Sequence, residues 1–438
     1  MKHLITLGLV CMGRDSFDVA AAAEIYARKK QELLDIENVR WVMIDEMVKE
    51  VDQAEDAART FVQENVDGVV LLSGTFHLGQ LALVFERSLN KPKLLWGFNE
   101  LPYDGGKIRL NTVCAINLNA SNLYKAGSDS YVCHVGDAID EAWVDAVRIR
   151  TALNSARLGI LGARAHGFFN LGIDELAFFK ETGTIIDYYD LRDGYEQPVT
   201  PAELGQSVAL TKKLFPYGDV TEAQIEKTAR LVCSLRKFIE KNRLDALALR
   251  CWPEFAAHYG TAPCAAMSIL QAEGHVLACE GDIQGAASML AFKAIGVKSP
   301  YLADLSQIDF ENNFALMWHC GVAPADLWDG VSERSLDTYF AGGKGVTAGF
   351  VMKSGPVHIL RIDSARGKTR MLAERGEAGP MDKLLKGTYA KVVFEKSARA
   401  LIDLVTNSGV AHHVAMAYGD YSQVLERLSR IMGWEIVA

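Results

Sequence analysis

The sequence lacks the patterns that mark several common protein classes. Within its 438 residues, no apolar run approaches the roughly 18 to 20 residues that cross a bilayer. The net charge is −9, so there is no excess of basic residues for binding nucleic acid. Only 11 prolines are present, and we find no low-complexity linker or internal repeat. These absences argue against membrane and nucleic-acid partners and favour two or three globular domains that pack on one another.

The cysteines and the first residues bear on the cellular compartment. The eight cysteines are dispersed, with no Cys-x-x-Cys pair, and most lie in apolar surroundings. This distribution predicts reduced, buried thiols and makes a zinc site built from cysteines improbable. The start of the chain resembles a signal peptide, but Gly13, Arg14 and Asp15 follow its apolar run at once. We therefore expect a first core strand there and a cytoplasmic protein.

Hydrophobic patterning predicts an α/β fold in three parts. Apolar strands alternate with amphipathic helices over residues 1–155, which indicates a parallel sheet covered by helices. A second unit of this kind is expected over residues 156–332. Short strands split by Gly, Ser and Pro predict an antiparallel module over 333–438, with a closing helix at 421–432. We thus expect two Rossmann-like or flavodoxin-like parallel-sheet domains followed by a C-terminal β-rich domain.

Acidic residues follow two predicted strands of the central domain. Glu254 comes directly after Trp252 and Pro253, and Glu280 and Asp282 stand where a strand passes into a helix. In open α/β sheets this edge binds ligands. On local sequence alone, Glu254 is more simply a solvated loop residue, and Asp282 is a helix N-cap. Glu280 and Asp282 share a face if the segment is extended, so either could be a ligand.

A histidine pair near the C-terminus could supply an imidazole ligand. His412 and His413 follow Asn407-Ser408-Gly409 in a predicted turn. A lone histidine is usually not a ligand, and adjacent side chains diverge, so at most one of the two should reach a given ion. Two separated acids and one histidine nevertheless make a plausible three-ligand site for a divalent metal with open positions.

Three motifs taken together resemble the L-fucose/L-arabinose isomerase superfamily. They are Trp252-Pro253-Glu254, Cys279-Glu280-Gly281-Asp282 with Gly285-Ala286, and Asn407-x-Gly-x-x-His412. The resemblance extends from about residue 157 to the end, and the N-terminal part matches mainly in predicted architecture. It implies an aldose–ketose isomerase that uses an enediol mechanism.

The resemblance also implies roles for individual residues. Glu254, Asp282 and His412 would bind the metal ion, and Glu254 and Asp282 would transfer the proton. Glu280 would support these ligands without binding the metal itself. Oxygen-rich ligation favours Mn²⁺, with Mg²⁺ or Co²⁺ as substitutes.

Four further residues are expected to bind substrate: Arg14, Trp252, His319 and His413. Arg14 follows the first strand, where the fucose isomerases also carry a sugar-contacting arginine. His319 could recognise sugar with Trp318 as a wall, although a buried structural histidine is about as plausible. Ala411 replaces the Asn that precedes the histidine in the fucose enzymes, so one substrate hydrogen bond is absent or made by His413.

The substrate and the competing functions stay open at this point. A fucose- or arabinose-type sugar needs an apolar pocket at C6, whereas an anionic aldohexose such as a sulfosugar needs Arg or Lys there. A non-catalytic sugar-binding protein would need no metal, and a metal-dependent aldolase or hydrolase would change the mass of its substrate. The resemblance further implies a homo-oligomer, expected to be a hexamer, in which Arg14 completes the active site of a neighbouring subunit.

Overall fold

The computed structural model describes residues 1–340 and 343–437 and divides them into two compact units. The N-terminal unit contains Lys2–Thr151 and Gln423–Trp434, and the main unit contains Ala152–Ser422 and the residues from Glu435 onward. The first division therefore lies close to the boundary predicted at 155/156. The predicted central and C-terminal domains lie together in the main unit, because one helix packs between their sheets.

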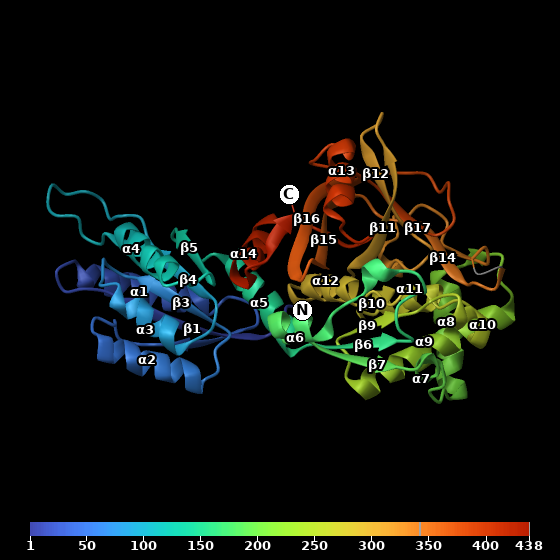
Figure 1. Ribbon diagram of the computed structural model, residues 1–438, viewed down its shortest axis with the longest axis horizontal. Helices are drawn as coiled ribbons and strands as arrows, with labels where there is room; N and C mark the ends of the chain where they lie inside the picture. The colour runs from blue at the N-terminus through green and yellow to red at the C-terminus, as the bar shows by residue number, and fades with distance from the viewer. Residues whose placement is uncertain (341–342, 438) are drawn as a thin grey trace. The chain divides into compact units, whose positions relative to one another are not determined.

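The N-terminal unit is built on one parallel sheet of order β2-β1-β3-β4-β5 (Figure 1). Its strands are β1 (Ile5–Met12), β2 (Val39–Met43), β3 (Gly68–Ser73), β4 (Lys93–Gly97) and β5 (Tyr131–Val135). Its helices are α1 (Val19–Leu33), α2 (Val51–Gln63), α3 (Gln80–Ser88), α4 (Thr112–Lys125), α5 (Glu141–Ser155) and α14 (Ser422–Met432). This flavodoxin-like order confirms the predicted α/β architecture and reverses direction between β1 and β3, where such sheets bind ligands.

Helix α14 belongs to the N-terminal unit although it lies near the end of the chain. Its buried residues Leu425, Leu428 and Ile431 recur at helical spacing, as predicted for an amphipathic helix. Arg427 Nε lies 2.8 Å from Asp140 Oδ2 and ties the helix to the start of α5. The last strand, β19 (Glu435–Val437), then returns to the main unit, where it pairs with β16.

The main unit contains a small parallel sheet of order β10-β9-β6-β7. Its strands are β6 (Arg157–Leu161), β7 (Ile185–Tyr189), β9 (Ala246–Leu249) and β10 (Leu277–Cys279). The helices around it are α6 (Glu175–Thr182), α7 (Leu191–Tyr195), α8 (Pro201–Leu214), α9 (Glu222–Asn242), α10 (Glu254–Tyr259), α11 (Cys264–Ala272) and α12 (Ile283–Ala294), with α13 (Ala398–Ser408) beside the second sheet. The parallel sheet predicted for the central domain is confirmed.

A second, mainly antiparallel sheet of the main unit closes into a barrel. Its neighbouring strands β16-β15-β18-β11-β12-β17 form a ring because β16 also pairs with β17. The ring consists of β11 (Tyr301–Asp309), β12 (Phe314–His319), β15 (Gly355–Ala365), β16 (Lys368–Gly379), β17 (Thr388–Phe394) and β18 (His413–Tyr418). Beyond it lie β14 (Thr347–Val351), β13 (Ser335–Asp337) and β8 (Tyr217–Gly218). The predicted antiparallel module therefore begins earlier than expected, at β11.

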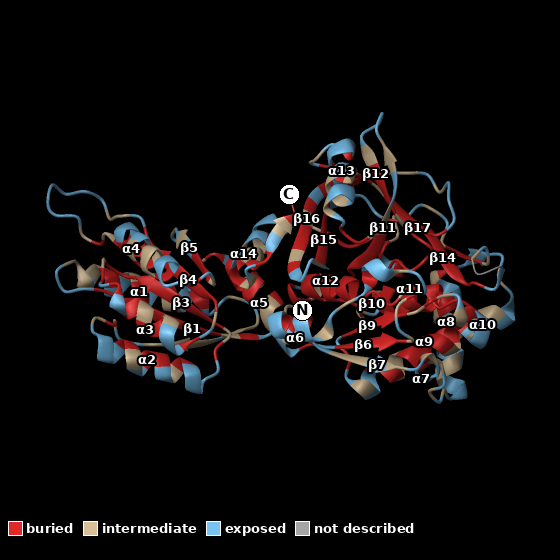
Figure 2. Cartoon of the chain, viewed as in Figure 1, coloured by how far each residue is buried: buried red, intermediate tan, exposed pale blue. Residues whose placement is uncertain are grey.

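Helix α12 joins the two sheets of the main unit. It contacts β6 and β9 on one side and β15 and β18 on the other, and nearly all of its residues are buried (Figure 2). The small residues Gly285, Ala286 and Ala287 permit this close packing. A Cβ at Gly285 would lie only 2.8 Å from Leu302 Cδ1 of the barrel. This helix positions the turn that precedes it against the barrel.

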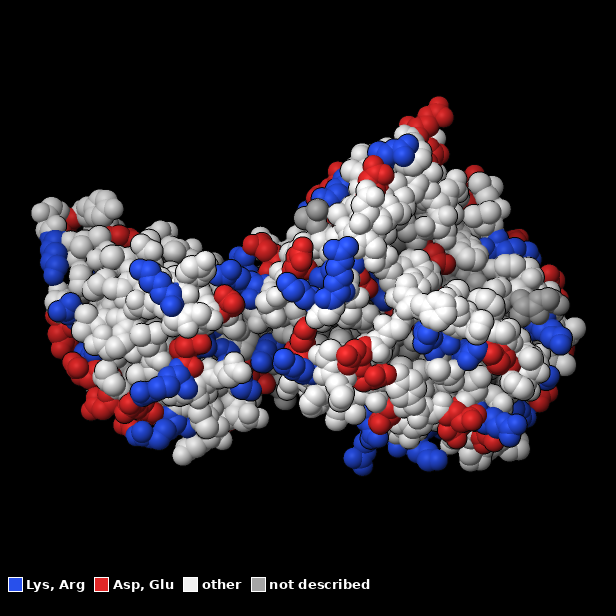
Figure 3. All heavy atoms as spheres, viewed as in Figure 1, with Lys and Arg blue, Asp and Glu red and all other residues white. Residues whose placement is uncertain are grey.

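Charged side chains of both signs are distributed over the surface. Lys and Arg are interspersed with Asp and Glu over the face of each unit drawn in Figure 3, without a continuous basic area. Among the residues that the structure describes, no helix combines the length and apolar character needed to cross a bilayer.

Candidate active site

Two carboxylates and three histidines converge in the main unit. We call them the carboxylate–histidine cluster: Glu280, Asp304, His319, His412 and His413. Their donor atoms form two triplets, Glu280–His412–His413 and Asp304–His319–His413, with all atoms of a triplet within 4.8 Å of one another. His413 belongs to both triplets and therefore lies at the centre of the cluster.

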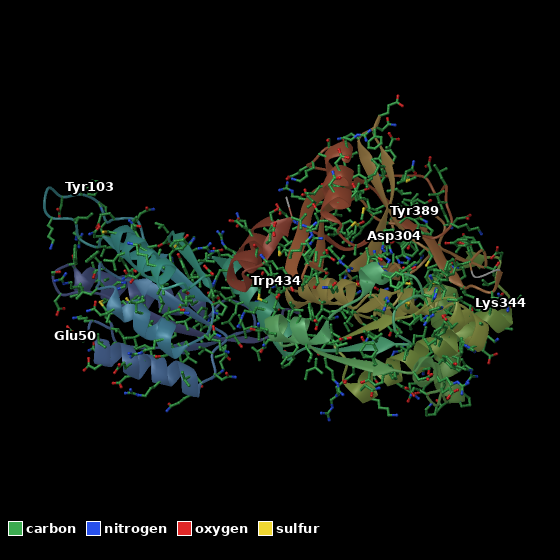
Figure 4. The ribbon with its side chains drawn as sticks, viewed as in Figure 1. Glu50, Tyr103, Asp304, Lys344, Tyr389 and Trp434 are labelled. Atoms are coloured by element: carbon green, nitrogen blue, oxygen red, sulfur yellow. The ribbon has the colours of Figure 1, made fainter. Side chains whose placement is uncertain are left out.

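The pairing of three barrel strands brings four of these residues together. Asp304, labelled in Figure 4, lies near the start of β11 and faces His413 on β18 across the ladder. On its other side Asp304 pairs with Trp318 of β12, and His319 ends that strand. His412 directly precedes β18. Residues from positions more than one hundred apart thus share one end of the barrel.

Glu280 reaches the cluster from the turn between β10 and α12. Its φ of 62° and the φ of 75° at Gly281 lie in the left-handed region, which is costly for a residue such as Glu280. A Cβ at Gly281 would lie 2.4 Å from the carbonyl oxygen of Ala163, so only glycine fits there. The Ala165 N–H donates to the Glu280 carbonyl at 2.8 Å and fixes the turn. The strained backbone holds the Glu280 side chain toward the histidines.

Polar atoms inside the cluster lack hydrogen-bond partners. Nε2 of His413 lies 3.3 Å from Glu280 Oε2 and 3.3 Å from Asp304 Oδ1, and Nε2 of His412 lies 3.5 Å from Glu280 Oε2. Among the described residues, no group hydrogen-bonds Glu280 Oε2, Asp304 Oδ1, His319 Nε2 or His413 Nε2, although all four atoms are buried. Buried polar atoms without partners are costly. Two carboxylates with imidazole nitrogens are a donor set that fits Mn²⁺ or a similar divalent ion.

A buried charged pair orients His413. Its Nδ1 lies 2.9 Å from Asp282 Oδ2, and the same oxygen pairs with the fully buried Arg361. An ionised Asp282 can only accept, so His413 Nδ1 donates to it, and Nε2 is the nitrogen that faces Glu280 and Asp304. A carboxylate behind a histidine is the arrangement that commonly orients metal-binding imidazoles.

The same contacts keep both acids of this region ionised. Burial alone would raise the pKa of Asp282, but the charge of Arg361 and the His413 hydrogen bond outweigh it and hold the pKa well below its usual range. Burial opposes ionisation of Glu280 too, yet the imidazoles of His412 and His413 beside its carboxylate outweigh burial and lower its pKa well below the usual value. Both carboxylates carry negative charge into the cluster.

Aromatic and amide side chains line one side of the cluster. The Phe168 ring meets Trp252 edge-on at 6.0 Å between centroids and His412 at 5.3 Å. Trp252 Nε1 donates to Glu280 Oε1 at 3.2 Å, and Asn170 Nδ2 lies 3.0 Å from His412 Nδ1. Aromatic rings arranged in this way can pack against the C–H faces of a sugar. Phe168 and Asn170 were not predicted as site residues, because they lie at the start of and within a short 3₁₀ helix (Phe169–Leu171) after β6 that no motif marks.

The structure separates the two acids that the motifs favoured as ligands. Glu254 begins α10, pairs with Arg250, and lines a separate cavity of about 490 Å³ with Gly162 and Tyr189. Asp282 caps α12 as predicted, with Oδ1 accepting from Gly285 N–H at 2.8 Å, and Oδ2 is taken by Arg361 and His413. Glu280, considered the rival ligand, faces the histidines instead.

The remaining predicted residues fall in three places. His319, His412 and His413 lie in the cluster, and Trp252 borders it. Arg14 follows β1 in the N-terminal unit, where its backbone N–H donates to Thr75 Oγ1 at 2.9 Å. Asp304 was not predicted as a site residue, because the strand that carries it was not predicted. Its position directly after the apolar residues 301–303 was the one available signal. The assignment of Glu254, Asp282 and His412 as ligands stays a prediction, and the geometry favours Glu280 and Asp304 as the acids.

Comparison with known proteins finds similarity to sugar isomerases. Residues 319–438 match the model of the L-fucose isomerase C-terminal domain. Relatives include the sulfoquinovose isomerase of Priestia aryabhattai, 27% identical over 98% of both chains. The sulfoquinovose isomerase of Alkalicoccus urumqiensis is 26% identical over 87% of this chain and 88% of that one, and that of Clostridium sp. (strain MSTE9) is 24% identical over 84% and 85%. A solute-binding protein from Burkholderia multivorans overlaps 58% of this chain and 82% of its own at 10% identity, but its TM-score of 0.19 supports no conclusion. The resemblance drawn from the three sequence motifs is confirmed, and the chain is an isomerase similar to the L-fucose isomerases.

Proposed function

We propose that this protein is a metal-dependent aldose–ketose isomerase whose substrate is a sulfonated aldohexose of the sulfoquinovose type. The convergence of Glu280, Asp304 and the histidine pair around unpartnered buried atoms is the observation that carries the metal-dependent reaction. Three relatives that match most of this chain bear the name of that activity, which supports the sulfosugar. We further propose that the protein acts in the cytoplasm on a free sugar, with neither a nucleic acid nor a membrane as partner.

Glu280, Asp304 and one histidine of the pair would hold the ion. The family motif selects His412, and the geometry also offers Nε2 of His413. Mn²⁺ is our first choice, with Mg²⁺ or Co²⁺ as substitutes. When bound, such an ion supplies positive charge for the two oxygens of an enediolate.

The side chains of the cluster can carry out the proton transfers. Glu280 Oε2 is unpartnered and ionised, so it can take the proton from C2 of the aldose and return it to C1. Asp304 Oδ1 faces the cluster from the opposite strand and can pass a proton between O1 and O2. Phe168 and Trp252 exclude water from one side of the sugar. Atoms balance because one proton moves between carbons and one between oxygens.

Activity should follow both the sugar and the metal. With sulfoquinovose and Mn²⁺, we expect a ketose of unchanged mass, detected by chromatography and mass spectrometry. Removing the metal with a chelator should lower kcat/KM by about 100-fold or more, and Mn²⁺ should restore it, because charge stabilisation by such an ion is worth several kcal/mol. Fragments or a hydrolysed product would indicate an aldolase or hydrolase. Sugar binding without conversion, and without any effect of metal, would indicate a binding protein.

We also propose that the protein forms a homo-oligomer, a hexamer, in which Arg14 enters the active site of a neighbouring subunit. Arg14 is exposed at the point where the N-terminal sheet reverses its strand order. Among the described residues, its guanidinium has no hydrogen bond or ion pair. A free cation at a ligand-binding edge suits the anionic group of a sulfosugar.

Mixing two inactive variants tests the shared site. If Arg14→Ala and Glu280→Gln chains co-assemble, up to about a quarter of the sites combine intact residues from both chains and regain activity. Arg28→Ala is the matched control, because Arg28 is an exposed arginine of the same unit already paired with Glu32 and Asp137. That variant should stay active alone. An active monomer by light scattering, or no recovery in chains that demonstrably co-assemble, would refute the proposal.

A further inference from the structure

A second group of atoms that could bind a metal lies beside the carboxylate–histidine cluster. Donor atoms of Cys279, His319 and Cys320 lie within 4.8 Å of one another, and all three residues are buried. Cys251 Sγ lies 3.1 Å from Cys279 Sγ, and Cys264 Sγ lies 3.6 Å from Cys320 Sγ. We call these four cysteines and His319 Nδ1 the thiol cluster. The proposed isomerase function uses none of the sulfur atoms, although His319 belongs to both clusters.

Four separate elements assemble the thiol cluster. Cys279 ends β10, Cys320 follows β12, Cys264 begins α11, and Cys251 lies just beyond β9. All four cysteines belong to the apolar core that the two sheets of the main unit share. Sulfur atoms in an apolar core pack as small hydrophobes, yet they are also the ligands that soft cations prefer over oxygen. The carboxylate–histidine cluster offers carboxylate oxygens and therefore favours harder divalent cations instead.

We propose that the thiol cluster binds one thiophilic cation, Zn²⁺ or Cu⁺, through Cys279 Sγ, Cys320 Sγ and His319 Nδ1. His319 Nδ1 lies 3.2 Å from Cys320 Sγ. Cys264 supplies the fourth ligand, because two sulfurs on a tetrahedral Zn²⁺ lie roughly 3.8 Å apart, close to its distance from Cys320. His319 Nδ1 now accepts a hydrogen bond from Cys320 N–H at 2.9 Å. When the cation binds, it replaces this N–H as the partner of His319 Nδ1. The bound thiols release their protons to solvent.

His319 connects this site to the active site. Its Nδ1 faces the thiol cluster, whereas its Nε2 is among the unpartnered atoms of the carboxylate–histidine cluster. Cys279 directly precedes Glu280 in the strained turn. A cation bound by the sulfurs therefore fixes the His319 ring and the turn that carries Glu280.

Cadmium titration tests the proposal without measuring isomerisation. The reduced full-length protein is first saturated with Mn²⁺, and Cd²⁺ is then added while the ultraviolet charge-transfer band of Cd²⁺–thiolate bonds is recorded. We expect the band to saturate at one Cd²⁺ per chain. Cys279→Ser and Cys320→Ser should each weaken binding by about tenfold or more. Cys114→Ser and Cys133→Ser are the matched controls, because these cysteines are exposed in the N-terminal unit, and binding should be unchanged.

Two results would overturn the proposal. One is a band that survives in Cys279→Ser and Cys320→Ser but disappears in Cys114→Ser or Cys133→Ser. The other, which needs no variant, is an X-ray absorption spectrum of the Cd²⁺-loaded protein with only oxygen and nitrogen neighbours. Two or more sulfur neighbours are expected. Failure of the sugar assay would leave these readouts unaffected, so the two proposals stand or fall separately.

Discussion

Replacing Glu280 by Gln is expected to abolish isomerisation, lowering kcat by about 100- to 10,000-fold. The change is nearly isosteric, but it removes the anion that faces His412 and His413 and the base proposed to move the proton. It should also weaken Mn²⁺ binding. Steady-state kinetics with the sulfosugar and calorimetric titration with Mn²⁺ measure the two effects, and circular dichroism checks the fold.

Glu254→Gln is the matched control for this experiment. Glu254 also follows a strand of the small parallel sheet, but it pairs with Arg250 and lines a different cavity. We expect its loss to change kcat far less than the loss of Glu280. If Glu254→Gln abolishes activity and Glu280→Gln retains it, the base lies at the position that the family motif favoured, and the geometric assignment fails.

Replacing Arg361 by Met is expected to destabilise the folded protein by about 3 to 5 kcal/mol. Arg361 and Asp282 are both fully buried, so removing the arginine leaves the Asp282 carboxylate without its principal counter-charge. The methionine keeps most of the volume, which limits any cavity. Urea unfolding followed by fluorescence measures the loss of stability. Metal binding by His413 should also weaken, because Asp282 orients the His413 ring.

Arg375→Met provides the comparison on the neighbouring strand of the barrel. Arg375 is 44% exposed and pairs with Asp420 and Glu395, so its replacement should cost no more than about 1 kcal/mol. Adding Asp282→Asn to the Arg361→Met protein should recover part of the lost stability, because the unpaired charge is then gone. Equal losses for the two arginines would show that burial of the Arg361 pair contributes nothing special.

Several features of this protein could be predicted from sequence because they depend on neighbours along the chain. Runs of apolar residues indicated the strands of both parallel sheets except β5, and the helix that begins at Ile283 was predicted with Asp282 as its N-cap. The three motifs indicated a resemblance to the L-fucose isomerases, which the comparisons confirm. They also drew attention to Glu280, His412 and His413, since all three lie within short conspicuous segments.

Only the tertiary structure decided which side chains meet. An extended segment would place Glu280 and Asp282 on one face, but the left-handed backbone at Glu280 and Gly281 turns them apart. Asp304 faces His413 through the register of two strands more than one hundred residues apart, and no local pattern encodes that register. Arg361 neutralises Asp282 from 79 residues further along the chain. Sequence patterns report hydrophobic periodicity and local hydrogen bonds, whereas the arrangement of a polar cluster depends on how distant strands pair and pack.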